Sequence, residues 1–318
     1  MNPAGLVGPQ HLGQRTRWVL VLPSAALVVY TLLLIASGAP QHPPDTGRLR
    51  KAVSGWGAGE TGAFAALLLI LVVVLQPLQQ AVVRLLTGNW GDSAVTRVLS
   101  WPGLWLHGRR RKHLQKESQA AEGSEQPPEE IRSAAAAARL RRMYPPADDL
   151  LPSCLGNVLR AGQGRAGKRY GLEAGVLWPR IYPLLPQRTA AIIDGQRDQL
   201  DMCMYFCGAF LSTTLIGAGL LATHGVWLLV TLPTLLLALL CYRAAVAAAV
   251  LFGELLETAF DLYRFDLLRA LHLPLPADRD SERAANALLS QFLLQGRPVN
   301  FVYDHPEPPV TGPYPPNP

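Results

Sequence analysis

The stretch MCMYFCGAFLSTTLIGAGLLATHGVWLLVTLPTLLLALLCY, residues 202–242, decides the fold class. It holds 41 residues without Asp, Glu, Lys or Arg, which is too long for one membrane-spanning helix of about 20 residues and sufficient for two. Thr223, His224 and Gly225 interrupt the apolar pattern near its middle. The stretch therefore predicts a transmembrane hairpin with spans over 202–222 and 226–242, in which Pro233 is a tolerated kink.

Two further uncharged apolar stretches, 18–38 and 61–83, predict two more spans nearer the N-terminus. The whole chain of 318 residues is 49% hydrophobic and only 16% charged, whereas a soluble domain carries about 25% charged residues. The first stretch also resembles a signal peptide, but its apolar core exceeds the usual length of about 15 residues and Pro40 would follow the cleavage site. We therefore expect an uncleaved anchor.

The distribution of basic residues predicts the orientation in the membrane. Between the second and third predicted spans lie 18 of the 29 Lys and Arg residues, so this segment should be cytoplasmic, and both termini with it. Arg48, Arg50 and Lys51, in the loop after the first span, count against this orientation. Only four of the 29 basic residues are lysine, which is typical of a GC-rich coding sequence and indicates a bacterial source. The membrane that these spans cross is therefore expected to be a bacterial cell membrane.

These features divide the chain into five segments. We expect a first transmembrane pair (1–86), a cytoplasmic interfacial segment with a disordered linker at 117–130 (87–149), and a small cytoplasmic unit (150–201). The hairpin with a cytoplasmic helical extension follows (202–273), since no proline interrupts the chain between Arg243 and Leu273. The last segment (274–318) is predicted to be a mostly disordered, proline-rich tail with a short helix at 288–294.

Residues 88–108 carry three tryptophans among apolar residues and predict an element lying on the inner leaflet. Arg109, Arg110, Arg111 and Lys112 follow at once. Such a cluster attracts anionic lipid headgroups by about 1 kcal/mol per charge, and these four are the candidate headgroup contacts. An alternative interpretation is a topology determinant that binds no ligand.

Two motifs resemble catalytic or metal sites but lack the required context. GQGRAGKR, residues 162–169, matches a phosphate-binding loop up to its last position, where Arg169 replaces the magnesium-binding hydroxyl residue, and no buried strand precedes it. We interpret it as a basic, glycine-containing turn. Cys203, Cys207 and Cys241 fall near the inner end of the hairpin without a neighbouring histidine, so we expect neither a metal nor any other cofactor.

Charged residues at the inner end of the hairpin are the candidate site. Folding about His224 brings Arg243 level with Met204, which places Asp198 and Asp201 nearby. Further along, the acids Glu254, Glu257 and Asp261 share one helical face at i, i+3 and i+7. This face is expected near Asp194, Arg197, Arg188 and Arg264. The set Asp198, Asp201, Arg243, Glu254, Glu257, Asp261 and Arg264 predicts either a structural salt-bridge seam or an ion path.

The motifs LGNVLRA (155–161), Tyr170-Gly171 and Trp178-Pro179-Arg180, ahead of a transmembrane hairpin, resemble uncharacterised multi-pass membrane proteins of actinobacteria. The resemblance covers mainly residues 150–274. It implies kinship and a membrane location, and it implies no activity and no functional residues.

The sequence thus predicts an all-α integral membrane protein with four transmembrane helices and a long cytoplasmic extension after the fourth. The leading hypothesis is a non-enzymatic membrane protein whose cytoplasmic region binds a partner or a second copy. The alternative is an oligomeric ion channel or a transporter-like protein, although no charge lies within the spans. Partners are expected to be the lipid bilayer and protein, not nucleic acid.

Overall fold

Helices are the regular elements throughout the described part of the chain, as the sequence predicts. The computed structural model describes residues 14–54, 57–91, 93–120, 127–296 and 298–305. In chain order the α-helices are α1 (Gln14–Ala36), α2 (Thr46–Ser54), α3 (Ala58–Thr87), α4 (Ala94–Gln119), α5 (Pro127–Met143), α6 (Cys154–Arg165), α7 (Ala174–Ile181), α8 (Gln187–Leu220), α9 (Leu232–Ala270) and α10 (Arg279–Gln295). Short 3-10 helices are η2 (Ala147–Asp149), η3 (Lys168–Tyr170), η4 (Tyr182–Leu184) and η5 (Gly225–Thr231).

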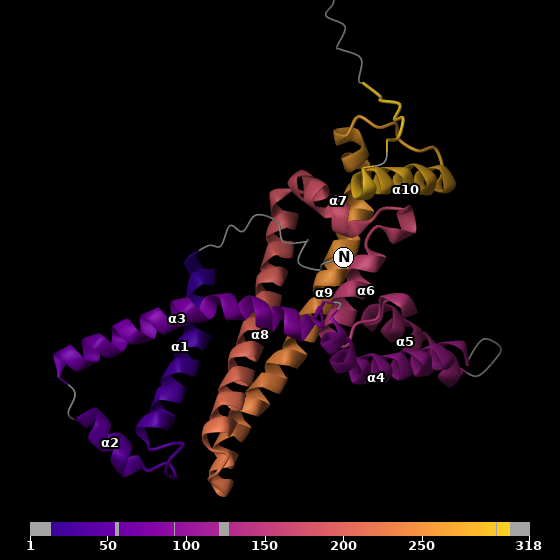
Figure 1. Ribbon diagram of the computed structural model, residues 1–318. Helices are drawn as coiled ribbons and strands as arrows, with labels where there is room; N and C mark the ends of the chain where they lie inside the picture. Colours follow the sequence, from indigo (N-terminus) through magenta and orange to yellow (C-terminus); the bar gives the residue numbers. More distant parts are fainter. Residues whose placement is uncertain (1–13, 55–56, 92, 121–126, 297, 306–318) are drawn as a thin grey trace, which may run out of the picture.

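Helices α8 and α9 form a long hairpin along which the other helices are arranged (Figure 1). Among the described residues, Gln187–Leu220 and Gly225–Ala270 are long and apolar enough to cross a membrane. Within the most apolar part of Gln187–Leu220, only 33% of the residues are buried by the rest of the chain. The corresponding share for Gly225–Ala270 is 28%. Leu215, Leu236 and Leu240 are among the exposed apolar side chains. A soluble core helix is mostly buried, so this exposure indicates membrane association.

The turn of the hairpin begins where the sequence predicts it. Helix α8 ends at Leu220, and the N–H of Leu221 still donates to the carbonyl of Gly217. After the turn the chain forms η5 before α9 begins at Leu232. Pro233 therefore lies in the first turn of α9, where its missing N–H costs no helical hydrogen bond. Pro233 thus lies at the junction of η5 and α9, and a kink of the fourth span there stays a prediction.

Helix α1 packs along α8 and is tied to the hairpin turn. Gly217 makes the close approach possible, because a Cβ there would lie 3.1 Å from the hydroxyl oxygen of Tyr30. Beyond the end of α1, the carbonyl oxygen of Pro40 lies 2.8 Å from Nε2 of His224. A small apolar cluster of Leu34, Ala39 and Leu221 closes this end of the molecule.

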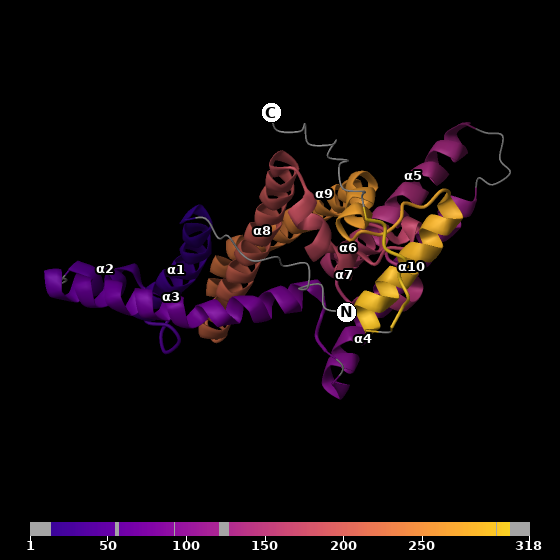
Figure 2. The same cartoon turned by 90° about the horizontal axis from the view of Figure 1, so that it is seen from above.

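Helix α3 runs across the hairpin in both views, not alongside it (Figures 1 and 2). It contacts α8 where Val82 fills the space beside Gly208, since a Cβ on Gly208 would lie 2.4 Å from Cγ1 of Val82. This glycine therefore serves packing within one chain. The described residues contain two candidate spans, and the spans expected over 18–38 and 61–83 stay predictions.

The far end of the hairpin belongs to a compact set of helices, here called the helical unit: α5, α6, α7, α10 and the ends of α8 and α9 remote from the turn. Helix α6 starts at an N-cap in which the Ser153 hydroxyl accepts from the N–H of Gly156. Its apolar face packs on α9, which continues unbroken to Ala270. The segment from Leu155 to Ile181 thus builds its core against α9. Fully buried side chains of this core are Leu155, Val158, Leu177, Ile181, Ile193, Leu256, Phe260 and Leu267.

Helix α10 is longer than the expected helix at 288–294, because it begins at a capping box. The Asp278 carboxylate accepts from the N–H of Ser281, whose hydroxyl accepts from the N–H of Asp278. Asn286 then donates to the carbonyl of Tyr170 at 2.9 Å, which docks α10 on the helical unit. The expected disordered linker at 117–130 is wrong at both ends, since α4 continues to Gln119 and α5 begins at Pro127. Its middle, 121–126, and residues 306–318 of the tail lie outside the described residues.

Candidate functional site

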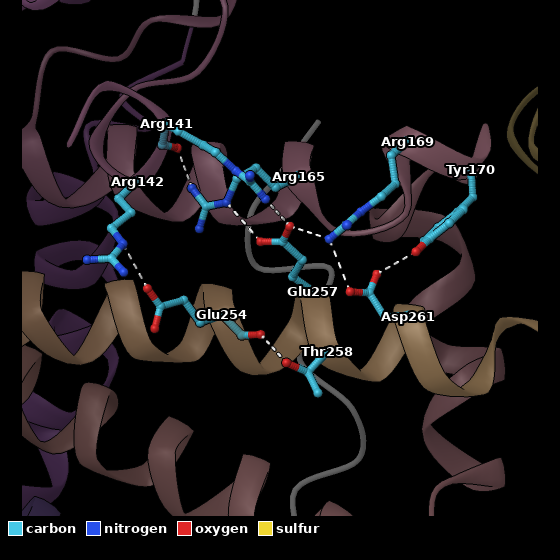
Figure 3. Close-up of polar contacts among 9 residues, drawn as sticks. All are labelled: Arg141, Arg142, Arg165, Arg169, Tyr170, Glu254, Glu257, Thr258 and Asp261. Atoms are coloured by element: carbon cyan, nitrogen blue, oxygen red, sulfur yellow. Dashed lines mark hydrogen bonds and ion pairs between the residues drawn. The ribbon is translucent and has the colours of Figure 1, made fainter. Parts of the chain in front are cut away.

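The acidic face of α9 lies against α5, α6 and η3 (Figure 3). Glu254, Glu257 and Asp261 are spaced by about one helical turn, so all three point to the same side. The chain segment 139–170 brings arginines from three elements to that side. We call the set of Arg141, Arg142, Arg165, Arg169, Tyr170, Glu254, Glu257 and Asp261 the arginine–acid cluster.

Glu257 is the centre of the cluster. Its carboxylate pairs with Arg141 of α5, with Arg165 of α6 and with Arg169 of η3. The Nε atom of Arg165 lies 3.2 Å from Oε2 of Glu257, and these two side chains are only 11% and 13% exposed. Arg165 also donates to the backbone carbonyl of Arg141. One largely buried carboxylate therefore joins three consecutive parts of the chain, α5, α6 and η3, to α9, which lies 88 to 116 residues further on.

Asp261 extends the cluster by one turn of α9. It accepts from Nη2 of Arg169 at 3.1 Å and from the hydroxyl of Tyr170 at 3.0 Å. The Arg264 guanidinium lies over the Tyr170 ring at 4.1 Å and pairs with Glu282 of α10 at 2.7 Å. Helix α10 is thereby connected to the same group of charges.

Glu254 makes the weakest pair of the cluster. Its carboxylate lies 3.0 Å from Nε of Arg142, but the two side chains are 40% and 59% exposed. An exposed pair contributes about 0–1 kcal/mol, since water screens it and both side chains lose rotational freedom. The energetic centre of the cluster is thus Glu257 with its three arginines.

The structure separates the sequence-predicted site residues into two groups. Glu254, Glu257, Asp261 and Arg264 lie at the cluster, although their partners are not the expected Asp194, Arg188 and Arg197. Asp201 lies 3.8 Å from Arg197 on its own helix, and Asp198 is exposed. Arg243 is exposed, and no ion pair joins it to another described residue. The expected pairing of Arg243 with Asp198 or Asp201 is therefore absent from the described chain.

The cluster residues that sequence reasoning missed are Arg141, Arg142, Arg165, Arg169 and Tyr170. Their pairings with α9 connect positions 88 to 116 residues apart, which helical spacing along one element does not reveal. One signal was present in GQGRAGKR. Its basic turn is real: Gly167 has φ +78°, and Arg165 and Arg169 flank it.

The phosphate-loop resemblance of that motif does not match its geometry. Gly162 lies inside α6, at the point where α6 crosses α9 next to Gly253. A Cβ on Gly162 would lie 2.8 Å from Cα of Gly253. A phosphate-binding loop instead needs a free glycine-rich turn between a strand and a helix. Gly162 is therefore a packing residue.

The candidate headgroup contacts lie on the second half of α4. Arg109, Arg110 and Lys112 are exposed, whereas Arg111 is half-buried and donates to the carbonyl of Pro145 at 3.1 Å. His107, one turn earlier, is buried with Nδ1 3.3 Å from the Tyr144 hydroxyl oxygen. Burial, with the nearby Arg110 charge, lowers the pKa of His107.

Metal ligation finds no support within the described ranges. No group of three or more His, Cys, Asp or Glu side chains there is arranged to hold a metal ion. Cys203, Cys207 and Cys241 are free thiols on α8 and α9. The charged contacts of the arginine–acid cluster instead serve to join helices.

Comparison with protein-family models, with curated proteins and with solved structures finds no match to this chain, so its function is argued from its own residues.

Proposed function

We propose that this protein is a non-enzymatic multi-pass membrane protein whose helical unit, on the cytoplasmic side, is presented to a protein partner or to a second copy of the chain. The observation that supports this proposal is the pairing of Glu254, Glu257 and Asp261 with arginines of the same chain. Carboxylates engaged in this way hold α5, α6 and η3 on α9 and give the unit a defined surface.

The same observation weighs against the channel alternative. Acids that line an ion path must face water and remain available to a passing cation. Glu257 is 13% exposed and shared by three arginines, so its negative charge is already compensated. A channel would need this cluster to open and its acids to turn toward a pore.

The experiment that tests the proposal measures mass and conductance on one preparation. The purified full chain is placed in lipid discs for mass measurement and in planar bilayers for single-channel recording. We expect no conductance from the parent, from Glu257→Gln or from the matched variant Glu254→Gln. Conductance in the parent that either substitution abolishes would overturn the proposal in favour of the channel.

A second arm looks for the presented surface in cell membranes. Ala138, exposed on α5, is replaced by a photoreactive residue, Ala138→p-benzoylphenylalanine, and Leu239→p-benzoylphenylalanine on the exposed face of α9 serves as the control. We expect discrete protein adducts, with a second copy or another protein, from position 138 and only lipid-sized adducts from position 239. Absence of protein adducts at position 138 would contradict partner binding through this surface.

A further inference from the structure

One side of α4 presents apolar side chains that no other described part of the chain covers. Val95, Val98 and Leu99 are 68%, 74% and 62% exposed, and one to two turns later Trp105 and Leu106 are 52% and 41% exposed. These positions follow the spacing i, i+3, i+4, i+10 and i+11, which places them in one stripe. We call them the α4 apolar stripe.

The opposite side of α4 is fixed in place, so the exposure of the stripe is set by the fold. A Cβ on Gly103 would lie 2.4 Å from the backbone oxygen of Pro152, which shows direct backbone contact. His107 packs on Tyr144, with ring centroids 5.9 Å apart, and Arg111 donates to the carbonyl of Pro145. The helix therefore cannot rotate to bury its stripe without losing these contacts.

The α4 apolar stripe lies where the uncharged half of the hairpin ends. Three residues after Pro152, which contacts α4, the N–H of Leu155 donates to the hydroxyl of Tyr242 at 3.2 Å. Tyr242 is the last residue of the uncharged stretch. Figure 1 shows α4 running crosswise to α8 and α9, beside the middle of their length. If the uncharged half of the hairpin crosses the bilayer, α4 lies at the level of its surface.

The charge on α4 identifies the kind of surface that would cover the stripe. The helix carries six basic residues and one acid, Glu117, in its last turn. Arg109 lies over the ring of Trp105 at 4.8 Å, so a guanidinium and an indole stand together at the end of the stripe. A second copy of α4 would be repelled by the same charges, whereas an anionic bilayer surface complements both the stripe and the basic residues.

We propose that α4 lies in the interface of an anionic lipid leaflet, with its apolar stripe in the acyl boundary and Arg109, Arg110 and Lys112 on lipid headgroups. The α4 helix then anchors the helical unit at the membrane surface, because α5 and the segment that leads into α6 at Pro152 pack on its buried side. This inference does not depend on which partner the helical unit binds.

The test measures quenching of tryptophan fluorescence by brominated lipid in the full chain. The chain has seven tryptophans, so the signal of one is obtained as the difference between the parent and a Phe variant. The protein is reconstituted into brominated phosphatidylcholine with and without phosphatidylglycerol. We expect Trp105→Phe to remove a quenched component, and Trp178→Phe, at a position 4% exposed in the core, to remove an unquenched one.

The headgroup part of the proposal has its own variant. A triple variant carries Arg109→Gln, Arg110→Gln and Lys112→Gln, and it keeps the hydrogen bond of Arg111 to the carbonyl of Pro145. The control for loss of positive charge is a double variant on exposed positions of α10, Arg279→Gln with Arg283→Gln. We expect phosphatidylglycerol to increase quenching of Trp105, and the triple variant alone to lose that increase. Equal quenching of Trp105 and Trp178, or quenching of Trp105 that ignores phosphatidylglycerol, would overturn the proposal. Circular dichroism verifies that each variant is folded.

Discussion

At the scale of single residues, Glu257 is the side chain whose loss should matter most to the helical unit. Glu257→Gln leaves Arg165, 11% exposed, without its carboxylate, and removing one member of a largely desolvated pair costs more than the pair contributes. We expect a loss of about 2 kcal/mol in stability. The apparent melting temperature of the full chain in lipid discs measures it.

The matched control for that prediction is Glu254→Gln, which removes one exposed pair with Arg142. Its effect should stay within about 1 kcal/mol, as for other surface ion pairs. Equal destabilisation by the two substitutions would contradict the central role of Glu257.

The buried His107 predicts a dependence of stability on pH. Its pKa is lowered in the fold by burial and by Arg110, so below the ordinary value of 6.5 the unfolded chain binds the proton more readily than the folded chain. Stability should therefore fall as pH decreases through this range. We expect His107→Gln to flatten the decrease of the melting temperature between neutral and mildly acidic pH. His113→Gln, at a side chain 74% exposed, should retain it.

The acidic face shows what residue-scale reasoning can and cannot predict. The spacing of Glu254, Glu257 and Asp261 is enough to place them on one side of a helix. Their partners were expected on α8, the neighbour along the chain, but α6 and η3 occupy that side of α9. Pairing between distant segments depends on the tertiary packing of α6, which spacing within one helix does not encode.

At the scale of elements, the crossing of α6 and α9 depends on two glycines in backbone contact. A Cβ at Gly162 would lie 2.8 Å from Cα of Gly253, and backbone cannot move aside as a flexible side chain can. We expect Gly162→Ala to destabilise the chain by about 1–3 kcal/mol. Gly164→Ala, with nothing within 4 Å of the new Cβ, should be neutral or stabilising by up to about 1 kcal/mol. Thermal unfolding of the two variants checks whether Gly162→Ala lowers the melting temperature and Gly164→Ala leaves it unchanged or raises it.

The hairpin and the extension of α9 are the elements that the sequence predicts best, from the length of the uncharged stretch and from the positions of the prolines. The 41-residue stretch with its break near His224 gave the hairpin, and the absence of proline after Arg243 gave the extension of α9 to Ala270. The sequence predicts a helix only at 288–294, whereas α10 begins at Arg279, because its start depends on the reciprocal capping of Asp278 and Ser281. That pattern differs from the usual Ser or Thr followed by Glu, so it gave a weak sequence signal.

At the scale of the whole molecule, the two ends of the hairpin differ in chemistry. The turn end has a small apolar cluster and the contact of His224 with Pro40, whereas the other end holds the arginine–acid cluster. The sequence predicts a span over 61–83, which lies within α3, yet α3 crosses the hairpin in Figure 2. The apolar composition of a helix determines whether it prefers lipid or water, but the direction in which it runs depends on its packing against other helices. For α3 this packing includes the contact of Val82 with Gly208.

This difference between the ends leads to a prediction of orientation. The helical unit and the basic half of α4 should face the cytoplasm, and the hairpin turn should face outside. Arg48, Arg50 and Lys51 belong to α2, which Figure 1 draws at the same end of the molecule as the hairpin turn. These three charges oppose the predicted orientation, but 18 basic residues between 84 and 201 favour it. We expect a membrane-impermeant maleimide to label Thr223→Cys in intact cells and Ala277→Cys only after permeabilisation. The parent, with its four free cysteines, gives the background. Labelling of Ala277→Cys in intact cells would show that the orientation is the opposite of the predicted one. The helical unit and its proposed partner would then lie outside the cell.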